Sequence, residues 1–169
     1  SPGFSPLSGT NAGGASPAAL GNAIAAAPVP VLVLGRGSNL LVADEGFGGI
    51  VVLLGEAFAS IDIDGVRVRA GGATSLPVLA RRTAAAGLSG LEWAVGVPGS
   101  VGGAVRMNAG GHGSDTVKTL RRYRLVDLTT GEGSDHDVAD LAATYRHTSI
   151  MRNQVVVWAE HELARGDKD

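Results

Sequence analysis

The sequence predicts an α+β protein with mixed sheets, arranged in two small lobes. Apolar, β-branched runs cluster between residues 29 and 70, an amphipathic segment follows at 74–87, and strand-like runs return after residue 113. Strands, then a helix, then strands are typical of α+β folds. Glycine is the third observation, because 26 of 169 residues are Gly while aromatic residues make up only 4%. Backbone must therefore make many of the close contacts, as in a protein wrapped around a large ligand.

The N-terminal residues divide into an arm and a helix. Residues 1–15 are mostly Ser, Pro, Gly and Asn without apolar periodicity, so we expect a flexible arm or tag remnant. Ser16 and Pro17 suit the N-cap and first position of a helix at about 17–27. The apolar run VPVLVLG at 29–35 predicts a strand buried on both faces, so a βαβ-like beginning is implied.

Further strand signals follow. NLLVAD at 39–44 and GIVVLLG at 49–55 predict two strands joined by a turn at 45–48. SIDID and VRVRA flank an Asp-Gly pair at 64–65, which indicates a β-hairpin. We place an N-terminal lobe at residues 16–72 and a second lobe at 73–169.

The second lobe begins with the strongest helix signal. A helix that starts at Thr74 or Ser75 and stops at Gly87 has one face formed by Leu76, Leu79, Ala80, Thr83 and Ala84. Later segments are expected to be a strand and turn at 121–133, a short helical or irregular piece at 137–145, and a closing strand at 154–163.

Composition excludes several classes of partner and site. The formal net charge is −2 and no long charge run is present, so no nucleic-acid partner is expected. The apolar runs are too short to span a bilayer, which predicts a cytoplasmic protein without membrane insertion. The absence of cysteine excludes disulfides and thiolate chemistry. His112 and His147 have no second ligand at metal spacing, so we expect them in turns or on the surface and predict no metal site.

The first of two glycine loops is Gly35-Arg36-Gly37-Ser38-Asn39-Leu40, which follows a predicted strand. Glycines let successive backbone N–H groups converge on an anion. A Rossmann fingerprint is excluded, because Leu40 replaces the third glycine and a strand rather than a helix follows. A tight turn between strands remains the alternative.

The second loop, residues 96–113, has seven glycines in eighteen positions. Pro98-Gly99-Ser100 predicts the start of a short helix through Val101 and Met107, whose free N–H groups form an anion site. A surface loop is the alternative, but interleaved apolar residues such as Val101 favour burial. Together the two loops predict a cradle for the diphosphate of an extended dinucleotide.

Three segments carry a family resemblance. These are VLVLGRGSNLLVADEGFGG at 31–49, GLEWAVGVPGSVGGAVRMNAGGHGSD at 90–115 and YRHTSI at 145–150. In this order and spacing they resemble the UDP-N-acetylenolpyruvoylglucosamine reductase family, also called UDP-N-acetylmuramate dehydrogenase (MurB). The resemblance implies a two-lobed, non-Rossmann FAD-binding fold of the vanillyl-alcohol-oxidase type.

The resemblance also implies roles for particular residues. Those expected along the FAD diphosphate and ribityl chain are Gly35, Arg36, Gly37, Ser38, Asn39, Leu40, Pro98, Gly99, Ser100, Gly103 and Ala104. Asn108, Gly110 and Gly113 are expected near the flavin. Arg146, preceded by Tyr145, matches the family's catalytic arginine, which would bind the enolpyruvyl carboxylate of the UDP-sugar substrate. NADPH would reduce the flavin in a step of peptidoglycan precursor and cell-wall synthesis.

The chain also departs from the family. Its sequence stops at Asp169, before the family's C-terminal substrate domain, which carries a proton-donating serine and a late glutamate. We therefore expect the chain alone to bind FAD but not to turn over the sugar nucleotide. Two alternatives are a fragment of an FAD-linked oxidase and a flavin-binding module without catalysis.

Overall fold

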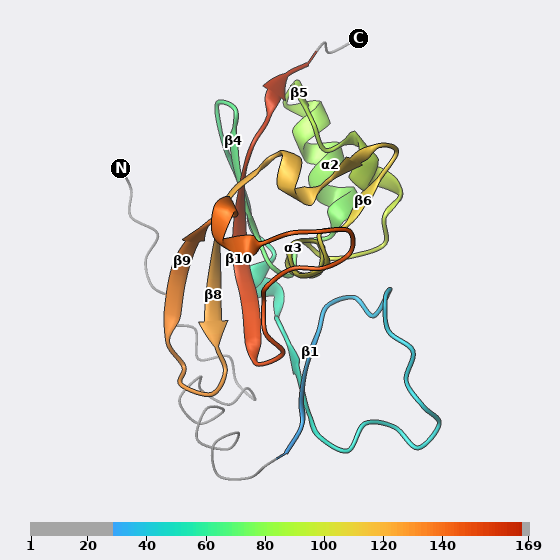
Figure 1. Ribbon diagram of the computed structural model, residues 1–169. Coiled ribbons are helices and arrows are strands. Elements are labelled where there is room, and N and C mark those ends of the chain that lie inside the picture. The colour runs from blue at the N-terminus through green and yellow to red at the C-terminus, as the bar shows by residue number, and fades with distance from the viewer. Residues whose placement is uncertain (1–28, 167–169) are drawn as a thin grey trace.

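The computed structural model describes residues 29–166, so the expected arm at 1–15 and helix at 17–27 lie outside the described range. In that range a five-stranded sheet with strand order β3-β4-β10-β8-β9 forms the centre of the molecule (Figure 1). Its strands are β3 (Ile61–Asp64), β4 (Arg67–Gly71), β10 (Gln154–Glu162), β8 (Leu120–Asp127) and β9 (Gly133–Asp137). Every neighbouring pair is antiparallel.

The β3–β4 hairpin confirms the Asp-Gly signal. Gly65 lies in the turn with a φ of 59°, a conformation that glycine adopts without steric penalty. β4 pairs with β10 from Gly71–Trp158 to Arg67–Glu162. The division expected at residue 72 therefore does not coincide with the sheet, because both hairpin strands belong to the same sheet as the later strands.

Two helices cover one face of this sheet (Figure 1). α2 (Leu76–Ala85) begins at its N-cap Ser75, and Gly87 follows its end with a φ of 72°. The predicted face is buried at four positions, while Ala84 is exposed. α3 (Val101–Met107) buries Val101, Ala104 and Val105. Together with the sheet these side chains form the main hydrophobic core.

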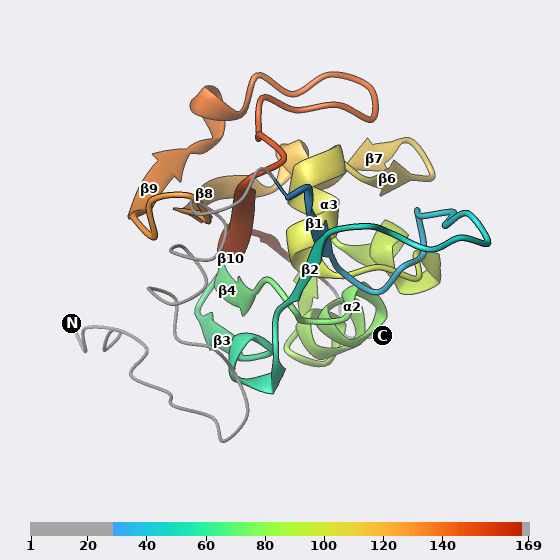
Figure 2. The ribbon, with the colours of Figure 1, turned by 90° about the horizontal axis from the view of Figure 1, so that it is seen from below.

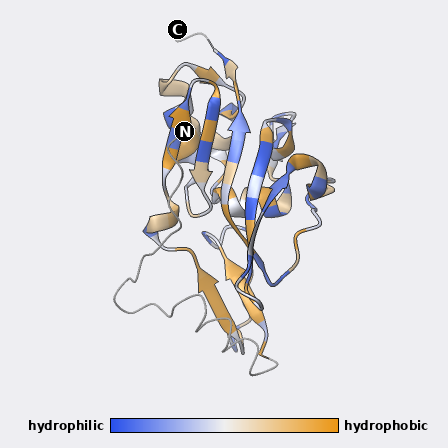
Figure 3. Ribbon diagram, turned by 90° about the vertical axis from the view of Figure 1, so that its left-hand side faces the viewer, coloured by the Kyte–Doolittle hydropathy of each residue, from blue (hydrophilic) through white to orange (hydrophobic). Residues whose placement is uncertain are grey.

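A second, smaller sheet packs against β10 at Val155, Val157 and Trp158, which belong to a separate hydrophobic cluster. β1 (Val31–Leu34) and β2 (Ile50–Leu53) pair in parallel. Their side chains contact a cluster around Leu128, Val155 and Val157, and both strands are strongly hydrophobic (Figure 3). The strand predicted at 29–35 is confirmed, but burial on both faces is wrong, since every residue of β1 is only partly buried.

The strand predicted at 39–44 is also wrong, because these residues belong to a long loop between β1 and β2. Leu41 is 97% exposed, and the backbone hydrogen bonds around it are those of turns, from Leu40 N–H to Gly37 O at 3.4 Å and from Gly46 N–H to Ala43 O at 2.9 Å. Parallel strands need a crossover connection, and within residues 29–166 this crossover finds no strand to pair with. The apolar residues of this segment therefore do not indicate a buried strand.

The remaining elements are short. They are strands β5 (Leu88–Ser89), β6 (Gly110–Gly111), β7 (Ser114–Asp115) and β11 (Ala164–Arg165), and 3-10 turns η1 (Glu56–Phe58), η2 (Glu92–Gly96), η3 (Thr116–Lys118) and η4 (Val138–Leu141). The irregular piece expected at 137–145 contains η4, and the closing strand expected at 154–163 is β10. No helix in the described range is long and apolar enough to cross a membrane.

Candidate functional site

The two glycine loops meet in space. A Cβ atom added to Gly35 would lie 2.6 Å from Ser100 Oγ, and one added to Gly99 would lie 3.7 Å from Ser38 Oγ. The first distance is shorter than real contacts of this kind, so the backbone at Gly35 can approach Ser100 only because glycine has no side chain. Seen from below, β1 leads towards α3 (Figure 2). The sequence-distant loops therefore form one junction.

The first amides of α3 are already satisfied by protein acceptors. Val101 N–H donates to Thr74 O at 2.9 Å, and Gly102 N–H donates to Gly72 O at 2.9 Å. Gly103 N–H donates to the capping Ser100 Oγ at 3.3 Å. The expectation that free N–H groups of this helix form an anion site is therefore wrong, because the turn before the helix is anchored to the end of β4.

The first loop has the opposite property. Its residues 36–39 are exposed, and within the described range their backbone N–H groups have no hydrogen-bond partner. Gly37 has a φ of 73°, which turns the chain in the way that lets consecutive amides point to one side. The loop is thus the part of the junction that offers backbone donors to a ligand.

A cavity of about 490 Å³ opens beside this junction, between β1 and the start of β10. That volume lies in the range of sites for organic cofactors. Its walls are largely apolar, with Val31, Leu32, Val33, Leu34, Phe47, Leu53, Leu54, Met151, Val155 and Val156 among the lining residues. Its polar side chains come from Arg36, Ser100, Arg106, Arg152 and Gln154.

Arg106 is the cavity residue whose electrostatics are most perturbed. It projects from α3 and is partly buried. Burial lowers the pKa of its guanidinium, and the positive charge of Arg152 lowers that pKa further. Both effects disfavour the charged form, although an arginine stays protonated at neutral pH. The cavity therefore holds two neighbouring cations that repel each other.

A second cluster lies at the other end of α3. Arg146 adopts a φ of 55°, and its Nη2 donates to Gly110 O at 2.9 Å. Its guanidinium carbon lies 5.6 Å from the centre of the Tyr145 ring, and Tyr145 is 89% exposed. A left-handed arginine costs about 1 kcal/mol or more and is typical of functional positions. The sequence motifs at 108–113 and 145–150 thus converge here.

Asn108 joins these motifs through its side chain. Its Oδ1 accepts from Val117 N–H at 3.2 Å, and its Nδ2 donates to Thr144 O at 3.2 Å and to Asp115 Oδ2 at 3.5 Å. It is buried and caps the end of α3 with a φ of 41°. The amide therefore fixes the loop that carries Arg146.

The expected site residues fall into three groups. Gly35, Arg36, Ser100 and Gly103 line the cavity; Asn108, Gly110, Tyr145 and Arg146 belong to the second cluster or touch it; Gly37, Ser38, Asn39, Leu40, Pro98, Gly99, Ala104 and Gly113 lie outside the cavity wall. Ala104 is buried in the core. Sequence reasoning missed Arg106 and Arg152. Arg106 could have been noticed as a lone charge within an apolar helix, whereas Arg152 carries no such signal.

Comparison with known proteins connects this arrangement to a cofactor. Residues 15–134 match the FAD binding domain family. UDP-N-acetylenolpyruvoylglucosamine reductase of Caulobacter vibrioides is 44% identical over 130 residues, which cover 76% of this chain and 43% of that protein. The Bacillus licheniformis enzyme of the same name is 49% identical over 122 residues, or 72% of this chain and 39% of that protein. The chain thus spans less than half the length of these relatives.

Solved structures agree with the sequences. The UDP-N-acetylenolpyruvylglucosamine reductase (MurB) of Thermus caldophilus matches 90% of this chain and 55% of that chain with a TM-score of 0.76 and 34% identity. 6-Hydroxy-D-nicotine oxidase of Arthrobacter nicotinovorans matches 88% of this chain and 34% of that chain with a TM-score of 0.61. At 21% identity the second likeness shows the fold alone. The α+β FAD-binding fold with mixed sheets expected from the sequence is confirmed.

Proposed function

This chain belongs to the FAD binding domain family, and we propose that it holds FAD as the flavin-binding part of a UDP-N-acetylenolpyruvoylglucosamine reductase. One observation carries the proposal: two glycine loops far apart in sequence touch at Gly35 and Ser100 beside a largely apolar cavity. A backbone approach without side chains suits a long, folded cofactor, and an apolar cavity suits an aromatic ring system.

The residues at the junction fit a dinucleotide. The exposed amides of residues 36–39 can donate to its phosphate oxygens, and the apolar walls can exclude water from its rings. The cofactor-binding residues expected from the sequence remain part of this proposal. FAD, when bound, supplies the capacity to accept and deliver a hydride.

Arg146 is proposed as the residue that binds and orients the substrate carboxylate. Its contact with Gly110 O uses one of five guanidinium N–H donors. Within the described range no carboxylate pairs with the remaining N–H donors of Arg146. The guanidinium can therefore make a bidentate contact with an enolpyruvyl carboxylate. Its fixed positive charge would stabilise negative charge that develops on that group. Tyr145 lies beside it and is proposed to line the same site.

The activity of the whole protein completes the proposal. We place NADPH as the electron donor, a UDP-linked enolpyruvyl sugar as the substrate, cell-wall precursor synthesis as the pathway and the cytoplasm as the location. The named activity of relatives that match at 42–49% identity supports this assignment.

Equilibrium dialysis against FAD tests the cofactor. We expect one FAD per chain, and a chain that takes up no FAD would contradict the proposal. Anaerobic addition of NADPH then separates an enzyme from a binding module, since only an enzyme would bleach the flavin absorbance. The reaction is tested in a chimera in which residues 29–166 replace the matching segment of the Thermus caldophilus enzyme. If the chimera binds FAD but its NADPH oxidation does not depend on the substrate, the proposed reaction is contradicted.

A further inference from the structure

The cavity beside the glycine junction has an unbalanced charge. Arg36, Arg106 and Arg152 line it, and among residues 29–166 no Asp or Glu lines it. Most of the remaining wall is apolar, so water screens these charges less than it would on an open surface. A cavity wall to which the described residues contribute three cations and no carboxylate is electrostatically suited to an anion.

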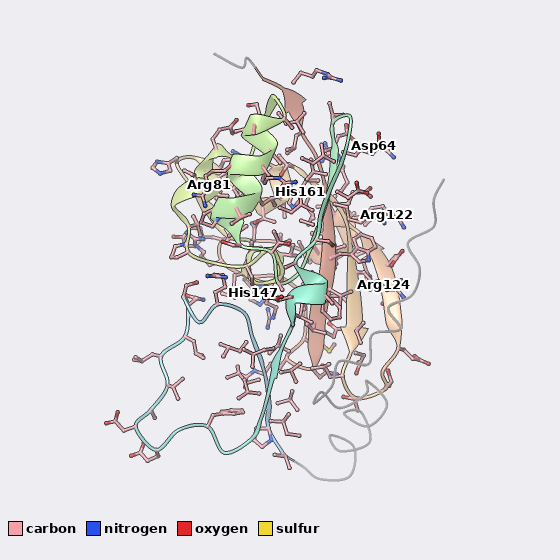
Figure 4. All side chains as sticks on the ribbon, turned by 180° about the vertical axis from the view of Figure 1, so that it is seen from behind. Asp64, Arg81, Arg122, Arg124, His147 and His161 are labelled. Carbon is pink, nitrogen blue, oxygen red and sulfur yellow. The ribbon has the colours of Figure 1, made fainter. Side chains whose placement is uncertain are left out.

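Some arginines of the central sheet, by comparison, are paired with carboxylates. On the outer side of the central sheet Arg122 and Arg124 contact Asp135 at 3.6 and 2.6 Å, and Arg69 contacts Glu160 at 2.7 Å. Figure 4 shows Arg122 and Arg124 on the strands, well away from α2. In residues 29–166, by contrast, Arg106 and Arg152 have no ion-pair partner.

The proximity of the Arg106 and Arg152 charges is unfavourable unless an anionic ligand binds between them. Arg106 is held in place by its own helix, whose residue 106 carbonyl accepts a hydrogen bond from Thr148 Oγ1 at 2.7 Å. Burial and the charge of Arg152 both lower the pKa of the Arg106 guanidinium. An anion between the two guanidinium groups would turn this repulsion into two charge-assisted contacts.

Because the first amides of α3 already donate to protein acceptors, arginine side chains are needed to bind a diphosphate here. Val101, Gly102 and Gly103 donate to protein acceptors, so this helix does not offer its N–H groups to a diphosphate. The first loop can contribute neutral backbone donors, but full positive charge must come from arginine. Arginine is also the side chain whose planar fork matches phosphate oxygens.

We propose that Arg106 and Arg152 form a two-arginine clamp on the diphosphate of the bound dinucleotide. The proposal rests on the proposed function, since it assigns the charge that holds the cofactor. The clamp replaces the helix N-terminus as the source of positive charge and makes these two residues determinants of dinucleotide affinity.

Arg106→Ala and Arg152→Ala test the clamp, with Arg81→Ala as the matched control. Arg81 lies on the exposed face of α2 (Figure 4) and does not line the cavity. We expect each clamp variant to weaken FAD binding roughly 10- to 100-fold, the range for losing a hydrogen bond to a charged group. The control should change FAD affinity by less than about twofold, and Arg106→Lys should lie between wild type and Arg106→Ala.

Two further readouts distinguish binding from folding. The dependence of FAD affinity on salt should become shallower in both clamp variants, because they remove a screened ionic contact. The urea midpoint of the FAD-free variants should stay at or above that of wild type, because a repelling cation is removed. A lower midpoint with an unchanged salt dependence would indicate a structural role and overturn the clamp.

The outcomes separate the clamp from the proposed function. If wild-type chain binds no FAD, the proposed function fails and the clamp with it. If wild type binds FAD and both alanine variants bind it with the same affinity and the same salt dependence, the clamp alone is wrong.

Discussion

His161 is a titratable side chain placed inside the core. It is 3% exposed, and its Nδ1 lies 3.0 Å from Thr119 Oγ1; Figure 4 shows it between α2 and the central sheet. Burial, and then the charge of Arg121, lowers its pKa to about 4. Because the unfolded chain has the ordinary value near 6.5, the unfolded state takes up a proton at a pH where the folded state does not.

The expected consequence is a loss of stability in acid. The free energy of unfolding should fall as pH decreases from about 6.5 towards 4, by on the order of 3 kcal/mol for this residue. Urea titrations between pH 7 and 4.5 measure it. His161→Gln, which can keep a contact with Thr119, should flatten the pH dependence, whereas His147→Gln, at an exposed position, should not. Identical slopes in wild type and His161→Gln would refute the assignment.

Residue-level prediction from sequence succeeded where a residue type has one structural use. Gly65 in an Asp-Gly pair and Gly87 after a helix both have positive φ, and only the local sequence is needed to expect this. The roles of His161, Arg106 and Arg152 depend on which strands and loops surround them. No local pattern carries that information.

At the scale of elements, the junction between the first loop and α3 depends on a missing side chain. Gly35→Ala would place a methyl group 2.6 Å from Ser100 Oγ and force this hydroxyl away from Gly103 N–H, which it caps at 3.3 Å. Loss of an N-cap costs about 1 kcal/mol. Gly35→Ala and Ser100→Ala should therefore each lower the free energy of unfolding by about that amount.

The double variant gives the decisive comparison. Gly35→Ala combined with Ser100→Ala should be about as stable as Ser100→Ala alone, because both changes remove the same cap. Gly55→Ala, where an added methyl group meets no atom within 4 Å, serves as control and should not destabilise. Strict additivity in urea unfolding would show that the loops do not touch as described.

Element prediction failed in two instructive places. Within residues 29–166 the apolar run at 39–44 finds no partner strand and is a loop, since hydropathy alone does not create backbone pairing. Conversely, β9 has the polar sequence GSDHD and no strand propensity. It forms because β8 offers Arg122 and Arg124 to its aspartates and stacks Tyr123 on His136 at 5.4 Å. In both segments the presence or absence of a pairing strand, rather than the local sequence, determined whether a strand formed.

At the scale of the whole molecule, the small β1–β2 sheet is the part most dependent on ligand. Its residues are partly exposed, and a two-stranded sheet is marginally stable by itself. FAD beside β1 should slow amide exchange in β1 and β2 by up to about 100-fold at 100 times the dissociation constant.

Hydrogen-exchange mass spectrometry with and without FAD measures this effect. Peptides from β3, β4 and the distal end of β10 provide the internal control, because they pack in the main core away from the cavity. Equal slowing in all peptides would mean that the molecule opens as a single unit and that the small sheet has no separate stability.

The fold class was predictable because the hydrophobic periodicity of the sequence indicates the order of strands and helix. The assignment of the β3–β4 hairpin to the large sheet was not, since β10, the strand that joins β4 to the rest of the sheet, lies 91 residues away at the Arg69–Glu160 contact. Long-range pairing of this kind is set by the whole core rather than by any segment.

The central position of β10 also constrains how the molecule is made. In the order β3-β4-β10-β8-β9 the middle strand comes last in sequence. During synthesis the β3–β4 and β8–β9 hairpins emerge from the ribosome before the strand that joins them. Their inner edges stay open until residues 154–162 arrive, so a nascent chain is exposed to edge-to-edge aggregation and the sheet closes only after this strand has been synthesised.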